Sequence, residues 1–240
     1  MFVQERQNLI LEELQENGKV LVKDLSERFH VTQDLIRKDL AHLESQGKCK
    51  KIYGGAILNR LNVHLEDANS RKTVNLKEKK EIASMAYDLM NEDMTVFLDI
   101  STTNIELAKL LVLHPISNIT IVTNMLDVVQ ILSKSQIRVI FIGGEFDYGR
   151  NGFVGNMCDE FLKRFHFDLS FLGVVGVDLE TKSVMTYMPD DGQTKKIVLE
   201  HSKKAYMLAD SDKFYQIGNY EYAKVDDFYG ILKTIKNNKK

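Results

Sequence analysis

Three hydroxyl side chains, Ser101, Thr102 and Thr103, directly follow an apolar run at residues 95–100 and begin a pattern typical of a helix. Hydroxyl groups and backbone N–H groups at the N-terminus of a helix bind anions, and the helix dipole adds to the attraction. A phosphate group is the natural ligand of such a site. The alternative is that these hydroxyls only cap the helix.

Polar side chains and glycines follow other apolar runs in the second half of the chain, where parallel strands would bring their ends to one edge of a sheet. Carboxylate and amide groups there can hydrogen-bond sugar hydroxyls, and lysines, Lys196 among them, can neutralise a phosphate. The set that we expect to bind the ligand comprises Asp99, Ser101, Thr102, Thr103, Asn124, Gly144, Asp178, Lys195 and Lys213.

Two of these carboxylates, Asp99 and Asp178, also allow an enzymatic interpretation. General acid–base chemistry needs carboxylates placed around one substrate, so a sugar-phosphate isomerase that uses these two groups is an alternative. The histidines lack the spacing of metal ligands, and Cys49 and Cys158 are too far apart in the sequence to suggest a zinc site. We expect no metal and no cofactor.

A helical pattern at residues 32–45 follows a shorter one at residues 21–29, after a sharp turn at His30. Two helices joined by such a turn form a helix-turn-helix, whose second helix enters the major groove of DNA. The start of that helix is polar and basic on its outer side, although a solvated helix face would look the same. The residues expected at the DNA are Thr32, Gln33, Asp34, Arg37 and Lys38.

Residues 46–60 contain four basic residues and no acidic residue. Gly54 and Gly55 predict a tight hairpin in this stretch, which would form a wing beside the helix-turn-helix. Lysines on such a wing can contact DNA phosphates next to the groove. The basic residues of the stretch are Lys48, Lys50, Lys51 and Arg60.

The composition is that of a soluble protein with one or two domains, because 44% of the 240 residues are hydrophobic and 28% are charged. No apolar run is long enough to cross a membrane, and the N-terminal segment lacks a signal-peptide pattern, so we expect a cytoplasmic protein. The net charge of −2 argues against a uniformly basic DNA-binding protein but permits a local basic patch.

From residue 75 onward, apolar runs typical of strands alternate with helical patterns. The runs are 95–100, 119–123, 138–144, 168–177, 204–210 and 227–234, and the helices are 103–113, 126–133, 157–165 and 193–201. This alternation predicts a mainly parallel α/β domain with both faces of its sheet covered. We therefore expect a winged helix-turn-helix domain at 1–58, a linker at 59–74 and the α/β domain at 75–240. The basic residues near the linker are interpreted as a solvated helix face; they are Arg71, Lys72, Lys77, Lys79 and Lys80.

Residues 24–56 resemble the signature of the DeoR family of bacterial transcription regulators. That signature reads V-S-x-x-T-I-R-R-D-L, then L-E-x-x-G, then a wing that ends in H-G-G-A. The matching residues are Val31, Ile36, Arg37, Asp39, Leu40, Leu43, Glu44, Gly47, Gly54, Gly55 and Ala56, and the departures are Thr32, Leu35, Lys38 and Tyr53. The resemblance implies that the helix and the wing, including Tyr53, bind DNA.

The second half resembles the effector domain of the same family, which is similar in fold to ribose-5-phosphate isomerase and senses phosphorylated sugars. Its motifs here are LDISTT, IVTN, IGG, FVGN, FLGVVGVD, DGQTK and ADSDKF. Ser101 replaces a glycine of the family pattern, and Asp191 with Gly192 replaces a Glu-Ala pair. A side chain at position 101 can hinder the approach of a phosphate, so a different ligand, weak binding or a vestigial site stays an alternative.

Together these observations predict a transcription regulator, a repressor of carbohydrate metabolism genes, that binds a double-stranded DNA operator and responds to a phosphorylated sugar. A homodimer or homotetramer is expected, because a symmetric operator needs at least two chains. The hypothesised mechanism is that the ligand alters the geometry of the dimer and thereby the operator affinity. The alternatives are an isomerase-like enzyme and a DNA-binding protein with a vestigial ligand site.

Overall fold

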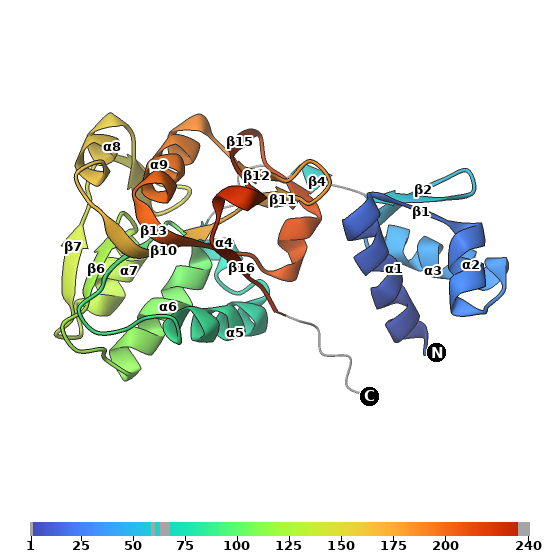
Figure 1. Cartoon of the computed structure of the whole chain (residues 1–240), viewed down its shortest axis with the longest axis horizontal. Coiled ribbons are helices and arrows are strands. Elements are labelled where there is room, and N and C mark those ends of the chain that lie inside the picture. Colours follow the sequence, from blue (N-terminus) through green and yellow to red (C-terminus); the bar gives the residue numbers. More distant parts are fainter. Residues whose placement is uncertain (1, 59–60, 63–67, 235–240) are drawn as a thin grey trace.

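The computed structural model describes residues 2–58, 61–62 and 68–234, which form a small N-terminal domain and a larger C-terminal domain (Figure 1). Arg60, predicted as part of the basic patch, lies outside the described residues. None of the described helices is both long and apolar enough to cross a membrane.

The N-terminal domain consists of three helices and a small antiparallel sheet whose strands lie in the order β1-β3-β2. Strands β2 and β3 form the hairpin predicted as a wing, and the helix-turn-helix is also confirmed. The elements are α1 (Val3–Asn17), β1 (Lys19–Leu21), α2 (Val22–Phe29), α3 (Gln33–Ser45), β2 (Cys49–Ile52) and β3 (Gly55–Leu58).

Individual residues next to these helices determine where the helices begin and end. Gly18 ends α1 with a φ of 68°, a left-handed conformation that glycine adopts without strain. His30 adopts the same region with a φ of 53° at the sharp turn after α2. Thr32 caps α3, because its hydroxyl accepts a hydrogen bond from the N–H of Leu35 at 3.4 Å.

A buried ion pair fastens α3 to α1 beside the apolar core of the domain. The guanidinium of Arg6 donates to the carboxylate of Asp39, and both side chains are almost completely buried. Gln7 donates a further hydrogen bond to Asp39 at 3.1 Å. Because Asp39 is buried, it positions the helix rather than contacting DNA.

The C-terminal domain is built on a six-stranded parallel sheet in the order β16-β13-β10-β5-β6-β7. The mainly parallel sheet predicted from the sequence is therefore confirmed. Its strands are β5 (Thr95–Leu98), β6 (Thr120–Thr123), β7 (Arg138–Phe141), β10 (Phe167–Gly173), β13 (Ser202–Leu208) and β16 (Gly230–Leu232).

Helices cover both faces of this sheet (Figure 1). One hydrophobic core joins Val96 and Leu98 of β5 to α5, α6 and α7, and a second core joins Phe97 of the same strand to α8 and α9. Successive side chains of a strand point to opposite faces, so both faces are apolar. The helices are α5 (Leu76–Tyr87), α6 (Thr102–Leu113), α7 (Leu126–Leu132), α8 (Asn156–Leu162) and α9 (Pro189–Glu200).

Two antiparallel additions to the domain were not predicted. The single strand expected at 168–177 is wrong, because β10 ends at Gly173 and β11 begins at Gly176 in a separate sheet of order β11-β12-β15. Helix α9 begins at Pro189, four residues before the predicted Gln193, since a proline is tolerated in the first turn of a helix. The added elements are β8 (Glu145–Asp147), β9 (Gly152–Val154), β11 (Gly176–Asp178), β12 (Ser183–Thr186) and β15 (Tyr220–Lys224).

The predicted linker contains short ordered elements. Strand β4 (Leu61–Asn62) pairs in parallel with β14 (Gln216–Ile217) of the C-terminal domain. The short helix α4 (Ala68–Arg71) then precedes α5, and residues 59–60 and 63–67 lie outside the described residues.

One aromatic side chain of the C-terminal domain packs against the core of the N-terminal domain. Tyr215 lies between the 3₁₀-helix η1 (Ser211–Phe214) and β14, and it contacts the cluster formed by α1, α2, α3 and the small sheet. Burial raises the pKa of Tyr215, and the charges of Asp212 and of Glu12 on α1 raise it further. Tyr215 therefore lies at the contact between the two domains.

Candidate functional site

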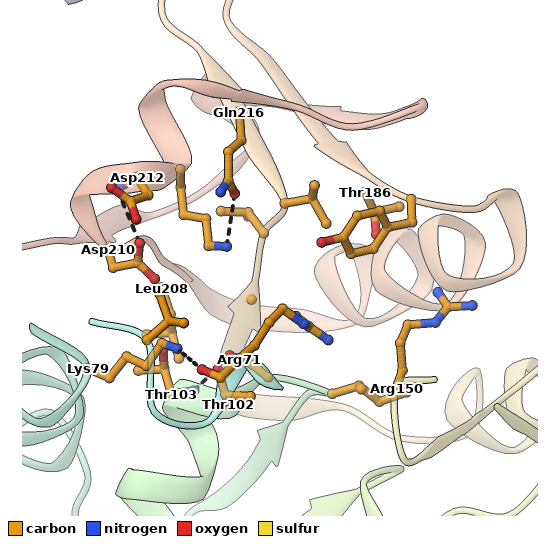
Figure 2. Close-up of a pocket in the computed structure, with 18 of the residues that line it drawn as sticks. Arg71, Lys79, Thr102, Thr103, Arg150, Thr186, Leu208, Asp210, Asp212 and Gln216 are labelled. Atoms are coloured by element: carbon orange, nitrogen blue, oxygen red, sulfur yellow. Dashed lines mark hydrogen bonds between the residues drawn. The ribbon is translucent and has the colours of Figure 1, made fainter. Parts of the chain in front are cut away.

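A pocket lies at the carboxyl ends of β5, β10 and β13, where ligands bind in open parallel α/β sheets (Figure 2). The N-terminus of α6, the helix α9, the segment that contains η1 and the segment around α4 and α5 contribute to its wall. The polar and charged residues that line it include Arg71, Lys79, Ser101, Thr102, Thr103, Arg150, Thr186, Asp191, Lys195, Asp210, Asp212, Lys213 and Gln216.

A network of buried charges forms one side of this pocket. The carboxylate of Asp99 accepts hydrogen bonds from Lys195 and from the N–H of Gly173, the latter at 3.0 Å. Asp191 lies 3.5 Å from the ammonium of Lys195 and 3.6 Å from the guanidinium of Arg150. Burial raises the pKa of Asp99, and the charge of Lys195 opposes that effect. Two carboxylates thus face two cations, so Lys195 is already paired before any ligand binds.

The N-terminus of α6 has the hydroxyl groups that the sequence predicts. The hydroxyl of Ser101 caps the helix by accepting a hydrogen bond from the N–H of Thr103 at 3.2 Å. Thr102 and Thr103 are buried beside it and line the pocket. Asn104 ties this turn to the sheet, because its amide donates to the backbone oxygens of Asp99 and Phe171, both at 2.9 Å.

Ser101 occupies the position where the family pattern has glycine, and the local backbone tolerates it. Its φ of −147° is ordinary extended backbone, so no glycine is required there. A Cβ atom on Gly173 of the neighbouring strand would lie 2.6 Å from the Cβ of Ser101. The space that the Ser101 side chain needs is therefore supplied by the missing side chain of Gly173.

Lys79 was interpreted from the sequence as solvated, but it is buried and lines the pocket. Its ammonium donates to the backbone oxygen of Arg71 at 2.6 Å. Burial lowers the pKa of Lys79 to about 8, Asp210 and Asp212 raise it, and Lys213 and Arg71 lower it. Its helical spacing to Ile82, Ala83 and Ala86, which are buried on the same helix, was the signal available in the sequence.

Arg71 and Arg150 are also pocket residues that the sequence prediction missed. Arg150 is nearly completely buried and its guanidinium contacts Asp147, Asp190 and Asp191. No local pattern indicates this, since Arg150 follows the β8 strand of an unpredicted hairpin. Arg71 ends α4 within the predicted linker.

Four of the predicted ligand residues, Asp99 among them, do not line this pocket. Asp178 belongs to β11, and its carboxylate accepts the N–H groups of Glu180 and Thr181 at 2.9 and 3.2 Å, in the turn that follows. The amide of Asn124 donates to the backbone oxygen of Phe153 at 2.8 Å. Gly144 is packed closely against β9 and α8, because a Cβ there would lie 2.6 Å from the oxygen of Val154.

The remaining predicted residues are distributed as follows. Ser101, Thr102, Thr103, Lys195 and Lys213 line the pocket, and Asp99 contacts Lys195 from beneath its wall. Lys196 is exposed on the outer side of α9. In the described part of the chain, no group of three or more His, Cys, Asp or Glu side chains is arranged to hold a metal ion.

The outer side of α3 presents the polar side chains expected at DNA. Gln33, Asp34, Arg37 and Lys38 are exposed, as is the capping Thr32. The guanidinium of Arg37 donates to Asp34 at 2.6 Å and to Gln33 at 3.1 Å. A surface ion pair of this kind contributes about 0–1 kcal/mol, so Arg37 can exchange it for a base or a phosphate at little cost.

The wing is a tight hairpin with an exposed tip. Lys50 and Lys51 are exposed, Lys48 is half-buried, and the ring of Tyr53 is fully exposed. Gly54 has a φ of 79°, which glycine adopts without strain.

The second glycine of the tip is required by close packing. A Cβ on Gly55 would lie 2.0 Å from the backbone oxygen of Val20 on β1. Glu44 of α3 accepts the N–H of Lys51 at 2.7 Å, which fixes the wing against the helix. The helix and the wing therefore form one surface.

Comparison with known protein families assigns both parts of the chain. Residues 6–61 match the DeoR-like helix-turn-helix domain, and residues 74–233 match the DeoR C terminal sensor domain. The two matches leave residues 62–73 of the predicted linker unmatched, and this stretch contains the pocket residue Arg71.

Curated relatives align with most of the chain. The glycerol-3-phosphate regulon repressor of Escherichia coli (strain K12) is 32% identical over 88% of this chain and 82% of its own length. The HTH-type transcriptional regulator GolR of Listeria innocua is 30% identical over 100% of this chain and 93% of its own. The L-fucose operon activator of Haemophilus influenzae is 30% identical over 87% of this chain and 83% of its own.

Among solved structures, ribose 5-phosphate isomerase A of Methanocaldococcus jannaschii aligns with a TM-score of 0.42 and 16% identity, over 60% of this chain and 55% of that chain. The strand pairings of this chain establish its parallel sheet. Since the sensor-domain family matches about two thirds of the residues and the helix-turn-helix family matches the N-terminal domain, the chain belongs to the DeoR family of transcriptional regulators.

Proposed function

We propose that the protein represses genes of carbohydrate metabolism and that a phosphorylated sugar, bound in the pocket of the C-terminal domain, changes its affinity for operator DNA. The observation that carries this proposal is the N-terminus of α6, where hydroxyl and N–H groups meet the cations Arg71, Lys79 and Lys213 in one pocket. The names of the relatives support the sugar connection, and they include an activator as well as repressors.

The pocket residues have a direct route to the DNA-binding domain. The segment from Asp210 to Gln216 lines the pocket with four of its residues and packs Tyr215 against the N-terminal core. Gln216 and Ile217 of β14 pair with β4, the short strand that follows the wing in the sequence. A ligand that moves this segment would therefore move the helix-turn-helix of one chain relative to that of the second chain on the DNA.

We also propose that the active form is a homodimer or homotetramer in the cytoplasm. Half-sites one helical turn of DNA apart are separated by about 34 Å, so a change in the relative position of two helix-turn-helix domains alters affinity without a change in the contacts of either one.

The isomerase alternative loses its proposed pair of acid–base groups. Asp99 is engaged by Lys195 and the N–H of Gly173, while Asp178 lies in another sheet and caps its own turn. General acid–base groups must both reach one substrate, and these two carboxylates do not line one pocket. For the vestigial-site alternative, Gly173 leaves space for Ser101, so the serine fits at the start of α6 without displacing the neighbouring strand.

The test is fluorescence anisotropy on DNA from upstream of the gene cluster of the protein, at fixed salt, with and without a panel of sugar phosphates. Salt must be fixed because phosphate contacts make DNA affinity strongly salt-dependent. The proposal requires binding tighter than to random DNA and a change of that affinity by at least one sugar phosphate. Specific binding that no sugar phosphate alters would contradict the sensor function but not the DNA-binding function.

The Arg37→Ala variant tests the recognition helix in the same assay. If Arg37 reads a base edge, the variant loses about 1–3 kcal/mol of specific binding and little of its binding to random DNA. An equal loss on both DNAs would refute base recognition by Arg37.

A further inference from the structure

Arg71 is the last residue of α4, in the stretch that connects the two domains, and its side chain nevertheless lines the sensor pocket. In Figure 2 this side chain extends into the middle of the ring of labelled residues, between Lys79 on one side and Arg150 on the other. The pocket therefore takes part of its wall from outside the sheet and helices of the sensor domain.

Few groups of the described residues contact the guanidinium of Arg71. Its carbon Cζ lies 5.9 Å from the centre of the Tyr187 ring, a cation–π distance. Its Nε is buried and has no hydrogen-bond partner in the described part of the chain. A buried donor without a partner is unfavourable, so this N–H is suited to a ligand acceptor.

The other arginine of the pocket differs in this respect. Arg150 contacts three carboxylates, those of Asp147, Asp190 and Asp191, whereas Arg71 has no carboxylate partner among the described residues. Lys195 is likewise paired with Asp99. Among the described carboxylates, those near Arg150 and Lys195 would compete with an incoming anion, and none is paired with Arg71.

We propose that Arg71 binds the phosphate group of the sensor ligand, so that the linker itself becomes part of the binding site. This inference rests on the proposed function. Arginine suits the role because its planar donors match the oxygens of a phosphate, and the helix N-terminus at Thr102 and Thr103 lines the same pocket.

The backbone of Arg71 makes this contact relevant to the linker. Its carbonyl oxygen accepts the ammonium of Lys79, which belongs to α5 of the sensor domain. A ligand held by the side chain of Arg71 would add a second attachment, so occupancy of the pocket fixes the end of the linker to the sensor domain. This explains how a ligand far from α3 can restrict the position of the DNA-binding domain.

The test compares the unmodified protein with Arg71→Gln, Arg71→Lys and the control Arg138→Gln. Arg138 is exposed on the edge strand β7 and does not line the pocket, so its variant removes one arginine charge without touching the site. Calorimetric titrations use inorganic phosphate, glycerol 3-phosphate, glucose 6-phosphate and, as a neutral probe, glycerol. Melting temperatures establish that each variant is folded.

We expect Arg71→Gln to weaken binding of the phosphorylated probe by at least about tenfold, since one charge-assisted contact is lost. Arg71→Lys keeps the charge but not the planar donors, so its affinity should lie between those of the unmodified protein and Arg71→Gln. The affinity of Arg138→Gln should equal that of the unmodified protein. Trypsin cleavage after Lys72 should slow on phosphate binding in the unmodified protein and not in Arg71→Gln.

The outcomes separate this inference from the proposed function. Binding of a sugar phosphate with equal affinity by the unmodified protein and both Arg71 variants would overturn the role of Arg71 and leave the sensor function intact. If the unmodified protein binds none of the phosphorylated probes, the proposed function fails for them and the inference fails with it. If Arg71→Gln is unfolded, Arg71→Lys decides the question by the same comparison.

Discussion

At the scale of single residues, the protonation of Lys79 makes the charge of the pocket depend on pH. Burial lowers its pKa from 10.5 to about 8, and the carboxylates of Asp210 and Asp212 only partly offset this effect. Between about pH 8 and 10.5, the unfolded chain therefore holds a proton on Lys79 that the folded chain has lost. For this group alone, the free energy of unfolding rises with pH across that window.

A bound phosphate should reverse this shift, because an anion near Lys79 favours the protonated ammonium. We predict that sugar-phosphate affinity falls as pH rises above about 8 and that binding near this pH takes up a proton. The phosphate itself stays dianionic there, since its second pKa is about 6. Calorimetry in buffers of different ionisation enthalpy measures the proton uptake.

Lys79→Met is the matched control for this prediction, because it keeps a long side chain at the buried position and removes the titrating group. Its ligand affinity should be lower at pH 7 and nearly independent of pH from 7 to 10. An unchanged pH dependence in Lys79→Met would show that a group other than Lys79 takes up the proton.

At the scale of structural elements, the segment with η1 and β14 contributes both to the ligand pocket and to the contact with the DNA-binding domain. Asp210, Asp212, Lys213 and Gln216 line the pocket, while Tyr215 packs against the DNA-binding domain. Asn75 donates to Asp210 and Asp212 at 3.1 and 2.7 Å, which ties the segment to the start of α5.

We predict that Tyr215→Ala uncouples the two domains. Ligand affinity should stay within about twofold, because the Tyr215 side chain packs on the other domain, while the ligand-dependent change in operator affinity should fall toward zero. Tyr215→Phe, which keeps the ring, should retain the coupling. Anisotropy titrations with and without the ligand measure both quantities, and full coupling in Tyr215→Ala would exclude this contact as the route.

The elements also show where sequence reasoning succeeds. Helix α3 and the wing are predictable because their ends are set locally, by the cap at Thr32 and by Gly54 and Gly55 at the hairpin. The parallel sheet is predictable because its strands are apolar on both faces and alternate with helices.

The missed residues depend on contacts that are distant in the sequence. Arg71 comes from a stretch that reads as polar linker, and only tertiary packing places it in the pocket. Lys79 has the helical spacing of a buried position, but a lysine in a charged stretch favours the interpretation as solvated. Asp178 follows an apolar run like those of the parallel strands, but its strand pairs with β12 in an antiparallel sheet. Hydrophobic pattern does not distinguish these two kinds of pairing when both faces are buried.

At the scale of the whole molecule, one recognition helix makes too few base contacts to discriminate a specific operator from random DNA. The start of α3 exposes Gln33, Asp34, Arg37 and Lys38, and two of the four are engaged with Arg37 in the free protein. A good base contact contributes about 1–3 kcal/mol of discrimination, whereas specific sites exceed random DNA by about 4–10 kcal/mol. Two helix-turn-helix domains on two half-sites reach that range, which favours a dimer on DNA.

We therefore predict that two chains bind one operator and that the spacing of its half-sites decides the affinity. An insertion of 5 base pairs, half a turn of the double helix, moves the second half-site to the opposite face and should reduce binding to that of a single half-site. An insertion of 10 base pairs restores the face and should weaken binding less. Stoichiometry from analytical ultracentrifugation and anisotropy on the three DNAs measure this, and one chain per operator with no loss at 5 base pairs would contradict the dimer.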